Sequence, residues 1–370
     1  MIRAPLSPPA AAEPEQLRQR KADHLDLCAS GPVGFQQRTT LLEQVELFHN
    51  ALPEVSFETL NVQCPLLGKT LQAPLLIASM SGGTLEAVAF NFDLAEVAEE
   101  YGLGMALGSQ RGLLVPGRIT DGYFLRDRAR STLLLGNIGG VQAAQCSTQE
   151  LEDKIVGPCG LDGLCIHLNP AQELIQPEGD RDFRGVEAAI SRLAESLSVP
   201  VVVKETGCGL SRAVGLRLVQ AGVKTVDVSG AGGTSWVGVE TLRATGRQAV
   251  LGQQLWDWGL PTAASLAQLS GLPLTRIATG GISNGLEIAR ALALGAQAVG
   301  VARPFLQAWR QGGKAGLVEA VETLLAGLKM VMVLTGSPDL HTLRQQPLVL
   351  GTSLQRYVIK DSPLAQKAGM

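Results

Sequence analysis

The sequence has few aromatic residues, no excess of basic charge and no closely paired cysteines. Aromatic residues make up 4% of the 370 residues, the formal net charge is -3, and the six cysteines include no C-x-x-C pair. This balance gives no positive field for a nucleic-acid backbone, so we exclude nucleic acid as a partner. The cysteine spacing disfavours disulfides and a zinc site, and is typical of a reduced, cytoplasmic protein.

A long apolar run is also missing. The longest candidate, residues 324–334, is shorter than the roughly 18 residues a span needs and contains Lys329. We therefore expect no membrane segment. Residues 1–15 contain four prolines and two acidic residues without an apolar segment of signal-peptide type, so we predict that they form a disordered leader.

The chain does contain a repeated alternation of short aliphatic runs with longer helical patterns. Eight runs are predicted as strands, at residues 74–79, 103–108, 132–137, 163–168, 200–204, 225–229, 276–279 and 298–301. Helical patterns cover residues 85–101, 148–156, 185–196, 211–221, 262–269 and 285–294. Strands of continuous hydrophobicity joined by helices indicate a parallel sheet buried on both faces.

Eight such units favour a single (β/α)8 TIM barrel over an open doubly wound sheet. No G-x-G-x-x-G motif opens the first unit, as a dinucleotide-binding fold would require. We predict a barrel over residues 73–336, an N-terminal segment over residues 16–72 that closes over its mouth, and a C-terminal helical segment over residues 337–370.

Polar or glycine-rich loops follow nearly every predicted strand, at the end of a barrel where active sites form. Small residues after the last three strands would let backbone N–H groups approach a phosphate. The expected phosphate cup consists of Gly280, Gly281, Ile282, Ala302 and Arg303, with hydroxyl groups from Ser229 and Thr234. The alternative is that these small residues serve only close helix packing.

The densest polar cluster follows the predicted strand at residues 163–168. His167 and Asn169 lie two residues apart and project from one face, whereas Gln172 and Glu173 follow a proline that ends the strand. We expect the four side chains to converge at the barrel mouth. The alternative is a helix entry with an Asn cap and a solvated acidic loop.

Lys204 ends an apolar strand, where its charge requires an anionic partner. Three roles remain open: a Schiff-base nucleophile, a phosphate ligand, or a cation beside the pyrimidine end of a flavin. The structural alternative is an ion pair with Glu205 or Asp227.

The order of these motifs resembles that of the type 2 isopentenyl-diphosphate isomerases, flavin-dependent enzymes of isoprenoid biosynthesis. The resemblance extends from Arg20 to Gly336. Its motifs are Arg20-Lys21-x-x-His24, Met80-Ser81-Gly82-Gly83, Gly108-Ser109-Gln110, His167-Leu-Asn169-x-x-Gln172-Glu173, Pro177-Glu178-Gly179-Asp180-Arg181, Val203-Lys204-Glu205 and Gly232-Gly233-Thr234-x-Trp236.

The resemblance implies an isomerase that interconverts isopentenyl and dimethylallyl diphosphate, with FMN kept reduced by NADPH and acting as an acid/base group. It implies a homo-oligomer, a tetramer or an octamer. The implied FMN contacts are Met80, Ser81, Gly82, Ser109, Asn137, Lys204, Ser229, Thr234, Gly280, Gly281, Ile282, Ala302 and Arg303. The implied substrate contacts are Arg20, Lys21, His24, Ser109, Gln110, Arg111, His167, Asn169, Gln172 and Trp236. Glu173 would bind Mg²⁺, and the implied catalytic residues are Gln172, Glu173 and His167.

Two other functions stay open. An FMN-dependent 2-hydroxy acid oxidoreductase would use the same barrel, but it needs a histidine base late in the barrel. None of the four histidines, His24, His49, His167 and His341, lies on the last four predicted strands. A non-catalytic phosphate- or flavin-binding module would have no use for Gln172 and Glu173 opposite Lys204.

Overall fold

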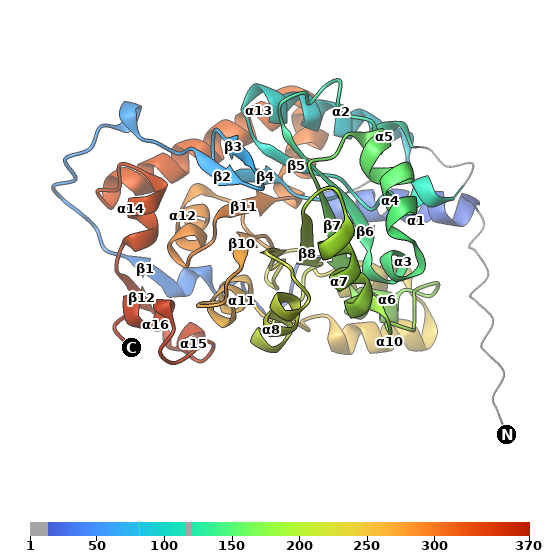
Figure 1. Cartoon of the computed structure of the whole chain (residues 1–370). Helices are drawn as coiled ribbons and strands as arrows, with labels where there is room; N and C mark the ends of the chain where they lie inside the picture. Colours follow the sequence, from blue (N-terminus) through green and yellow to red (C-terminus); the bar gives the residue numbers. More distant parts are fainter. Residues whose placement is uncertain (1–13, 81, 116–119) are drawn as a thin grey trace.

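A closed barrel of eight parallel strands forms the centre of the protein (Figure 1). The computed structural model describes residues 14–80, 82–115 and 120–370. The strands run in the order β10-β11-β4-β5-β6-β7-β8-β9. They are β4 (Leu75–Ile77), β5 (Gly104–Ala106), β6 (Leu133–Gly139), β7 (Gly163–Leu168), β8 (Val201–Glu205), β9 (Thr225–Asp227), β10 (Thr275–Ala278) and β11 (Ala298–Val301). Each of these eight barrel strands overlaps a predicted one, so the (β/α)8 prediction is confirmed.

The barrel strands are apolar because both of their faces are covered. All residues of β6 and β8 are buried, as expected for a parallel sheet with side chains inside and helices outside. The register aligns His167 with Lys204, and Lys204 with Asp227. Three ionisable side chains therefore lie side by side near the carboxyl ends of β7, β8 and β9.

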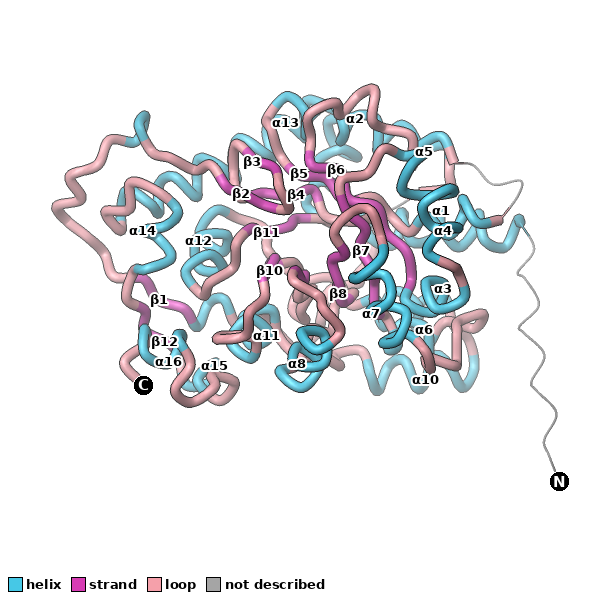
Figure 2. Tube along the Cα trace, in the orientation of Figure 1, coloured by secondary structure: helices cyan, strands magenta, loops and turns pink. Residues whose placement is uncertain are grey.

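Helices surround the barrel, as the tube in Figure 2 shows. They are α2 (Leu85–Glu100), α3 (Gly140–Gln145), α4 (Thr148–Leu151), α5 (Gly157–Cys159), α6 (Pro170–Ile175), α7 (Val186–Ser196), α8 (Arg212–Gln220), α9 (Trp236–Arg243), α10 (Gly246–Leu255), α11 (Thr262–Gln268), α12 (Gly285–Ala293) and α13 (Arg303–Leu334). Short turns η3 (Gln110–Leu114), η4 (Asp121–Tyr123) and the π-helix η5 (Glu152–Val156) complete the set. No helix in the described ranges combines the length and apolar character needed to cross a bilayer.

Local signals explain several of these helix ends. The side chains of Thr84, Ser211 and Asn284 each accept a hydrogen bond from a backbone N–H in the first turn of α2, α8 and α12. The helix predicted over residues 148–156 is present, but it changes its hydrogen-bond pattern at Glu152, where α4 passes into the π-helix η5.

The N-terminal segment begins with α1 (Pro14–Ser30), which packs against α9 and α13. Of the leader predicted over residues 1–15, residues 1–13 lie outside the described residues. Its last two residues are not a leader, because α1 already starts at Pro14. The segment continues through η1 (Leu42–Gln44), β1 (Val45–Leu47), η2 (Phe57–Thr59) and a hairpin of β2 (Cys64–Leu66) and β3 (Lys69–Leu71). At the amino-terminal side of the barrel, Lys69 of this hairpin pairs with Asp162 at 2.9 Å.

The C-terminal segment is mainly helical, as predicted, and also contains one short strand. It comprises α14 (Leu340–Gln345), β12 (Leu348–Leu350), α15 (Thr352–Gln355) and α16 (Pro363–Lys367). Strand β12 pairs antiparallel with β1, apart from the barrel (Figure 2). Lys367 donates to the carbonyl of Ala293 at the end of α12, and Arg344 donates to that of Ala296. Cations at the carboxyl end of a helix are stabilising, so they help to hold this segment on the barrel.

Candidate active site

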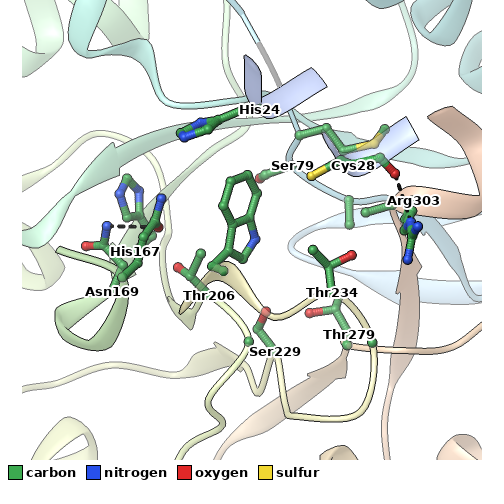
Figure 3. Close-up of a pocket in the computed structure, with 18 of the residues that line it drawn as sticks. His24, Cys28, Ser79, His167, Asn169, Thr206, Ser229, Thr234, Thr279 and Arg303 are labelled. Atoms are coloured by element: carbon green, nitrogen blue, oxygen red, sulfur yellow. Dashed lines mark hydrogen bonds between the residues drawn. The ribbon is translucent and has the colours of Figure 1, made fainter. Parts of the chain in front are cut away.

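A cavity of about 520 Å³ lies at the carboxyl ends of the barrel strands (Figure 3). Residues that follow each of the eight strands contribute to its lining. Helix α1 adds Arg20, Lys21, His24, Leu25 and Cys28, whose spacing puts them on one helical face. The cavity therefore lies where a TIM barrel places its chemistry, with an N-terminal helix as one wall.

Most of the predicted site residues line this cavity. From the predicted FMN set they are Met80, Gly82, Ser109, Asn137, Lys204, Ser229, Thr234, Gly280, Gly281, Ile282, Ala302 and Arg303. From the predicted substrate and catalytic sets they are Arg20, Lys21, His24, Ser109, Arg111, His167, Asn169, Gln172, Glu173 and Trp236. Ser81 lies outside the described residues.

Gln110 is the exception among the described residues. Its side chain is 0% exposed and does not line the cavity. Its amide oxygen accepts from the backbone N–H of Asn137 at 2.9 Å, and its amide nitrogen donates to Cys159 Sγ at 3.2 Å. The Gln110 side chain therefore does not reach the cavity, because the turn η3 directs it inward, and its expected contact with a diphosphate stays a prediction.

His167 is held in one tautomer. The Asn137 amide donates to the carbonyl of Leu107 at 3.0 Å, so its oxygen faces His167 Nδ1 at 2.9 Å. Burial, assisted by the charge of Lys204, lowers the pKa of His167 to about 3. A neutral ring that donates through Nδ1 must carry its lone pair on Nε2. His167 consequently presents an acceptor, not a cation, to the cavity.

Lys204 is buried among acidic groups that the ends of the strands supply. Its ammonium group donates to the main-chain carbonyl of Glu205 at 2.6 Å. The Glu205 carboxylate instead accepts from the backbone N–H groups of Thr206 and Cys208, and burial raises its pKa to about 7. Asp227, aligned with Lys204, accepts from Thr279 Oγ1 at 2.6 Å. Lys204 thus lines the cavity, and the carboxylate of the residue aligned with it is itself held in place.

Glu173 is the one carboxylate among the described residues that line the cavity. Oε1 accepts from Asn169 Nδ2 at 2.9 Å, and Oε2 accepts from the backbone N–H of Asp180 at 2.8 Å. Burial raises the pKa of Glu173, and the two hydrogen bonds oppose that effect. Within the described ranges no group of three His, Cys, Asp or Glu side chains could hold a metal. A cation here would need most of its ligands from a bound anion or water, an arrangement that suits Mg²⁺.

Glu240 is a site residue that sequence reasoning missed. It lies on α9 with its side chain 0% exposed, and it accepts from His24 Nε2 at 2.8 Å and from Gln172 Nε2 at 3.3 Å. Although burial opposes ionisation, His24 and Arg243 hold the pKa of Glu240 below its usual value. The only feature of the sequence that could have pointed to Glu240 was its position four residues after Trp236, on the same helical face.

Two loops with little side-chain volume form a narrow cup at one end of the cavity. A Cβ atom on Gly233 would lie 2.4 Å from the backbone nitrogen of Gly281, and Gly281 itself has a φ of 75°. Only glycine allows this approach and this conformation without strain. Arg303 begins α13 beside the cup and donates to the carbonyls of Cys28 and Gly31, so it also anchors the end of α1 (Figure 3).

The cavity has a cationic lining. Five basic side chains line the cavity together with a single carboxylate, that of Glu173, within the described lining; they are Arg20, Lys21, Arg111, Lys204 and Arg303. Two buried polar atoms at the cavity, Ser79 Oγ and Arg20 Nε, have no hydrogen-bond partner. Buried polar groups are normally satisfied, so these two atoms are the groups beside the cavity that still lack a hydrogen-bond partner. Ser79, Thr206 and Thr279 also line the cavity and were not predicted.

Comparisons with known proteins agree with this geometry. A family described as FMN-dependent dehydrogenase matches residues 178–350. An isopentenyl-diphosphate delta-isomerase from Synechococcus sp. is 46% identical over 340 residues, which cover 91% of this chain and 97% of the relative. A second, from Methanosarcina mazei, is 41% identical over 345 residues, covering 92% and 94%. A flavocytochrome b2 variant of known structure has a TM-score of 0.67 at 18% identity, covering 96% of this chain and 90% of its own, which shows the shared fold alone.

Proposed function

Because the chain belongs to the isopentenyl-diphosphate delta-isomerase family, we propose that it interconverts isopentenyl and dimethylallyl diphosphate with reduced FMN and Mg²⁺. The observation that carries the proposal is the lining of the cavity, whose described residues include five basic side chains and one carboxylate. A diphosphate has several negative charges, which a surplus of basic side chains over carboxylates in the lining would balance.

The residues of the cavity fit FMN. The cup between Gly233 and Gly281 gives a phosphate access to backbone N–H groups beside Arg303. The unpartnered hydroxyl of Ser79 and the ammonium group of Lys204 are polar groups for the ring system. When bound and reduced, FMN supplies an acid/base group strong enough for an unactivated alkene and an electron-rich ring that stabilises the resulting cation. NADPH is the proposed reductant.

The substrate's diphosphate would lie against Arg20, Lys21 and Arg111, all of which line the cavity. Glu173 would hold Mg²⁺ on the diphosphate through a carboxylate already oriented by Asn169 and Asp180. His167 would accept a hydrogen bond at Nε2, or become a donor if the arriving anion raises its pKa. These side chains bind and orient, and they leave the carbon chain to the apolar part of the cavity.

The opposite wall keeps water from the reacting carbon atoms. The rings of His24 and Trp236 meet edge to face, with centroids 5.2 Å apart. Glu240 holds His24 and Gln172 at the same time, so α1 and α6 close over the cavity together. Excluding water matters because a tertiary carbocation would react with it. Gln172 orients the reacting end and cannot itself be the acid, because a carboxamide has no acidic proton.

The alternative function, a 2-hydroxy acid oxidoreductase, would use the same barrel but requires a histidine base late in the barrel. His167 is on β7 and His24 on α1, so among the described strands β8 to β11 no histidine is available as its base. The test is to purify the protein, identify its flavin, and supply lactate or isopentenyl diphosphate in separate anaerobic reactions. Lactate should leave the oxidised flavin spectrum unchanged; bleaching by lactate without isomerisation would replace this proposal with the oxidoreductase.

A further inference from the structure

Tyr123 is a fully buried residue next to the cavity that the mechanism above does not use. It ends the turn η4, has 0% exposure and does not line the cavity. Its turn is anchored on both sides: the backbone N–H of Tyr123 donates to the carbonyl of Thr120 at 2.9 Å, and the Asn91 side chain donates to the carbonyl of Gly122 at 3.0 Å. The ring therefore occupies a fixed position.

The hydroxyl group of Tyr123 makes two hydrogen bonds whose directions are fixed by chemistry. Lys21 Nζ lies 3.1 Å from the hydroxyl oxygen, which lies 2.8 Å from the carbonyl oxygen of Ser109. A carbonyl can only accept and an ammonium group can only donate. The tyrosine hydroxyl must therefore donate a hydrogen bond to the Ser109 carbonyl and accept one from the Lys21 ammonium group. Burial raises the pKa of Tyr123, so the hydroxyl keeps the proton that this arrangement needs.

Two glycines make room for this contact. A Cβ atom on Gly82 would lie 2.3 Å from the Tyr123 hydroxyl oxygen, and one on Gly83 would lie 2.6 Å from Lys21 Nζ. The backbone after β4 is thus shaped to let the lysine of α1 reach the tyrosine.

Lys21, Gly82 and Ser109 all line the cavity beside Arg111, whereas Tyr123 lies behind them. We propose that Tyr123 is the positioning residue that aims the Lys21 ammonium group at the phosphate end of the substrate. This inference rests on the proposed function for the identity of the ligand. A lysine side chain loses rotamer entropy when it is fixed on a ligand, and a fixed acceptor removes that cost from the binding step.

The test is Tyr123→Phe in the full-length, FMN-loaded protein, which keeps the ring and removes the acceptor. We expect the Kd for inorganic pyrophosphate, measured by calorimetry, and the KM for isopentenyl diphosphate to rise about tenfold. A rise of this size corresponds to the loss of one charge-assisted hydrogen bond. FMN content and kcat should stay within about twofold of wild type, because neither depends on Lys21. Tyr101→Phe is the matched control, since that hydroxyl bonds Glu322 on the surface.

A double-mutant cycle with Lys21→Met separates positioning from packing. If Tyr123 acts through Lys21, adding Tyr123→Phe to Lys21→Met raises the pyrophosphate Kd no further. An unchanged Kd in Tyr123→Phe, an unchanged Kd in Lys21→Met, or fully additive losses would each overturn the proposal. If Tyr123→Phe does not fold, Lys21→Met alone must still weaken pyrophosphate binding at least tenfold. Wild-type protein that binds no pyrophosphate would instead refute the proposed function.

Discussion

His24 Nε2 lies 2.8 Å from Oε1 of Glu240, a carboxylate with no exposed side-chain surface. The two residues are 216 positions apart in the chain and join α1 to α9. Arg243 contacts the other oxygen of Glu240 and also lies 3.3 Å from Asp23 on α1. The wall that α1 adds to the cavity is therefore held by charge as well as by packing.

Replacing Glu240 by alanine should loosen this wall. Removing one partner of a buried charged network costs about 3 kcal/mol of unfolding free energy, because the remaining groups stay desolvated and unpaired. We expect urea denaturation to show that loss, with a raised KM for isopentenyl diphosphate. Glu322→Ala on the exposed face of α13 is the control. A Glu240→Ala protein as stable as this control would show that the contact is not important.

Glu173→Gln should abolish most turnover and leave FMN bound. An amide keeps the size of the side chain but loses the charge that a hard divalent cation requires. A loss of at least 100-fold in kcat corresponds to about 2.7 kcal/mol of transition-state stabilisation. Initial rates across a Mg²⁺ titration check this expectation, with Asp182→Asn in the following exposed loop as the control. Full activity in Glu173→Gln would remove the metal assignment.

His167 should remain neutral throughout the physiological range, because its pKa in the folded protein is about 3. A folded-state pKa below the unfolded value of about 6.5 means that the unfolded chain binds more protons between these two pH values. The titration of His167 should therefore leave the free energy of unfolding unchanged above pH 6.5 and lower it as the pH drops from 6.5 toward 3. Nitrogen-15 NMR of labelled histidine, without substrate, should show Nδ1 protonated and Nε2 bare at pH 6. An imidazolium signal for His167 at that pH would contradict this expectation.

Lys204→Ala should weaken FMN binding and raise the pKa of His167, since the lysine charge helps to lower that pKa. Fluorescence titration of flavin-free protein with FMN measures the first effect, which we expect to be at least tenfold, or about 1.4 kcal/mol. Lys224→Ala, at the exposed position before β9, is the matched control. Equal FMN affinity in the two variants would leave Lys204 with a structural role only.

The barrel could be predicted from the sequence because each strand is a short apolar run that a local pattern reveals. The pairing of β1 with β12 could not, since Val45 and Leu350 are aligned only by the folded chain. The predicted side chains at the strand ends reach the cavity because residues that end parallel strands share one edge. That the Gln110 side chain points away from the cavity could not be predicted, because the direction of a side chain within a short turn is not periodic.

Glu240 and Tyr123 show a second limit of prediction from the sequence. Each is buried beside a predicted ligand-binding residue, yet each acts through a partner more than 100 positions away. An acidic residue on a helix and a tyrosine in a loop look ordinary in sequence. Their contacts depend on which residues α1 meets when it lies over the cavity; the sequence predicted that this segment covers the barrel mouth, but not its partners on α9 and η4.

The most direct test of the central claim is anaerobic proton NMR of isopentenyl diphosphate incubated with the protein in deuterated water. With FMN reduced by NADPH and Mg²⁺ present, we expect dimethylallyl diphosphate that carries deuterium, because the alkene is protonated from a group that exchanges with solvent. Oxidised FMN, or removal of Mg²⁺, should leave the substrate unchanged. No product with reduced FMN and metal, or equal product with the flavin oxidised, would contradict the account.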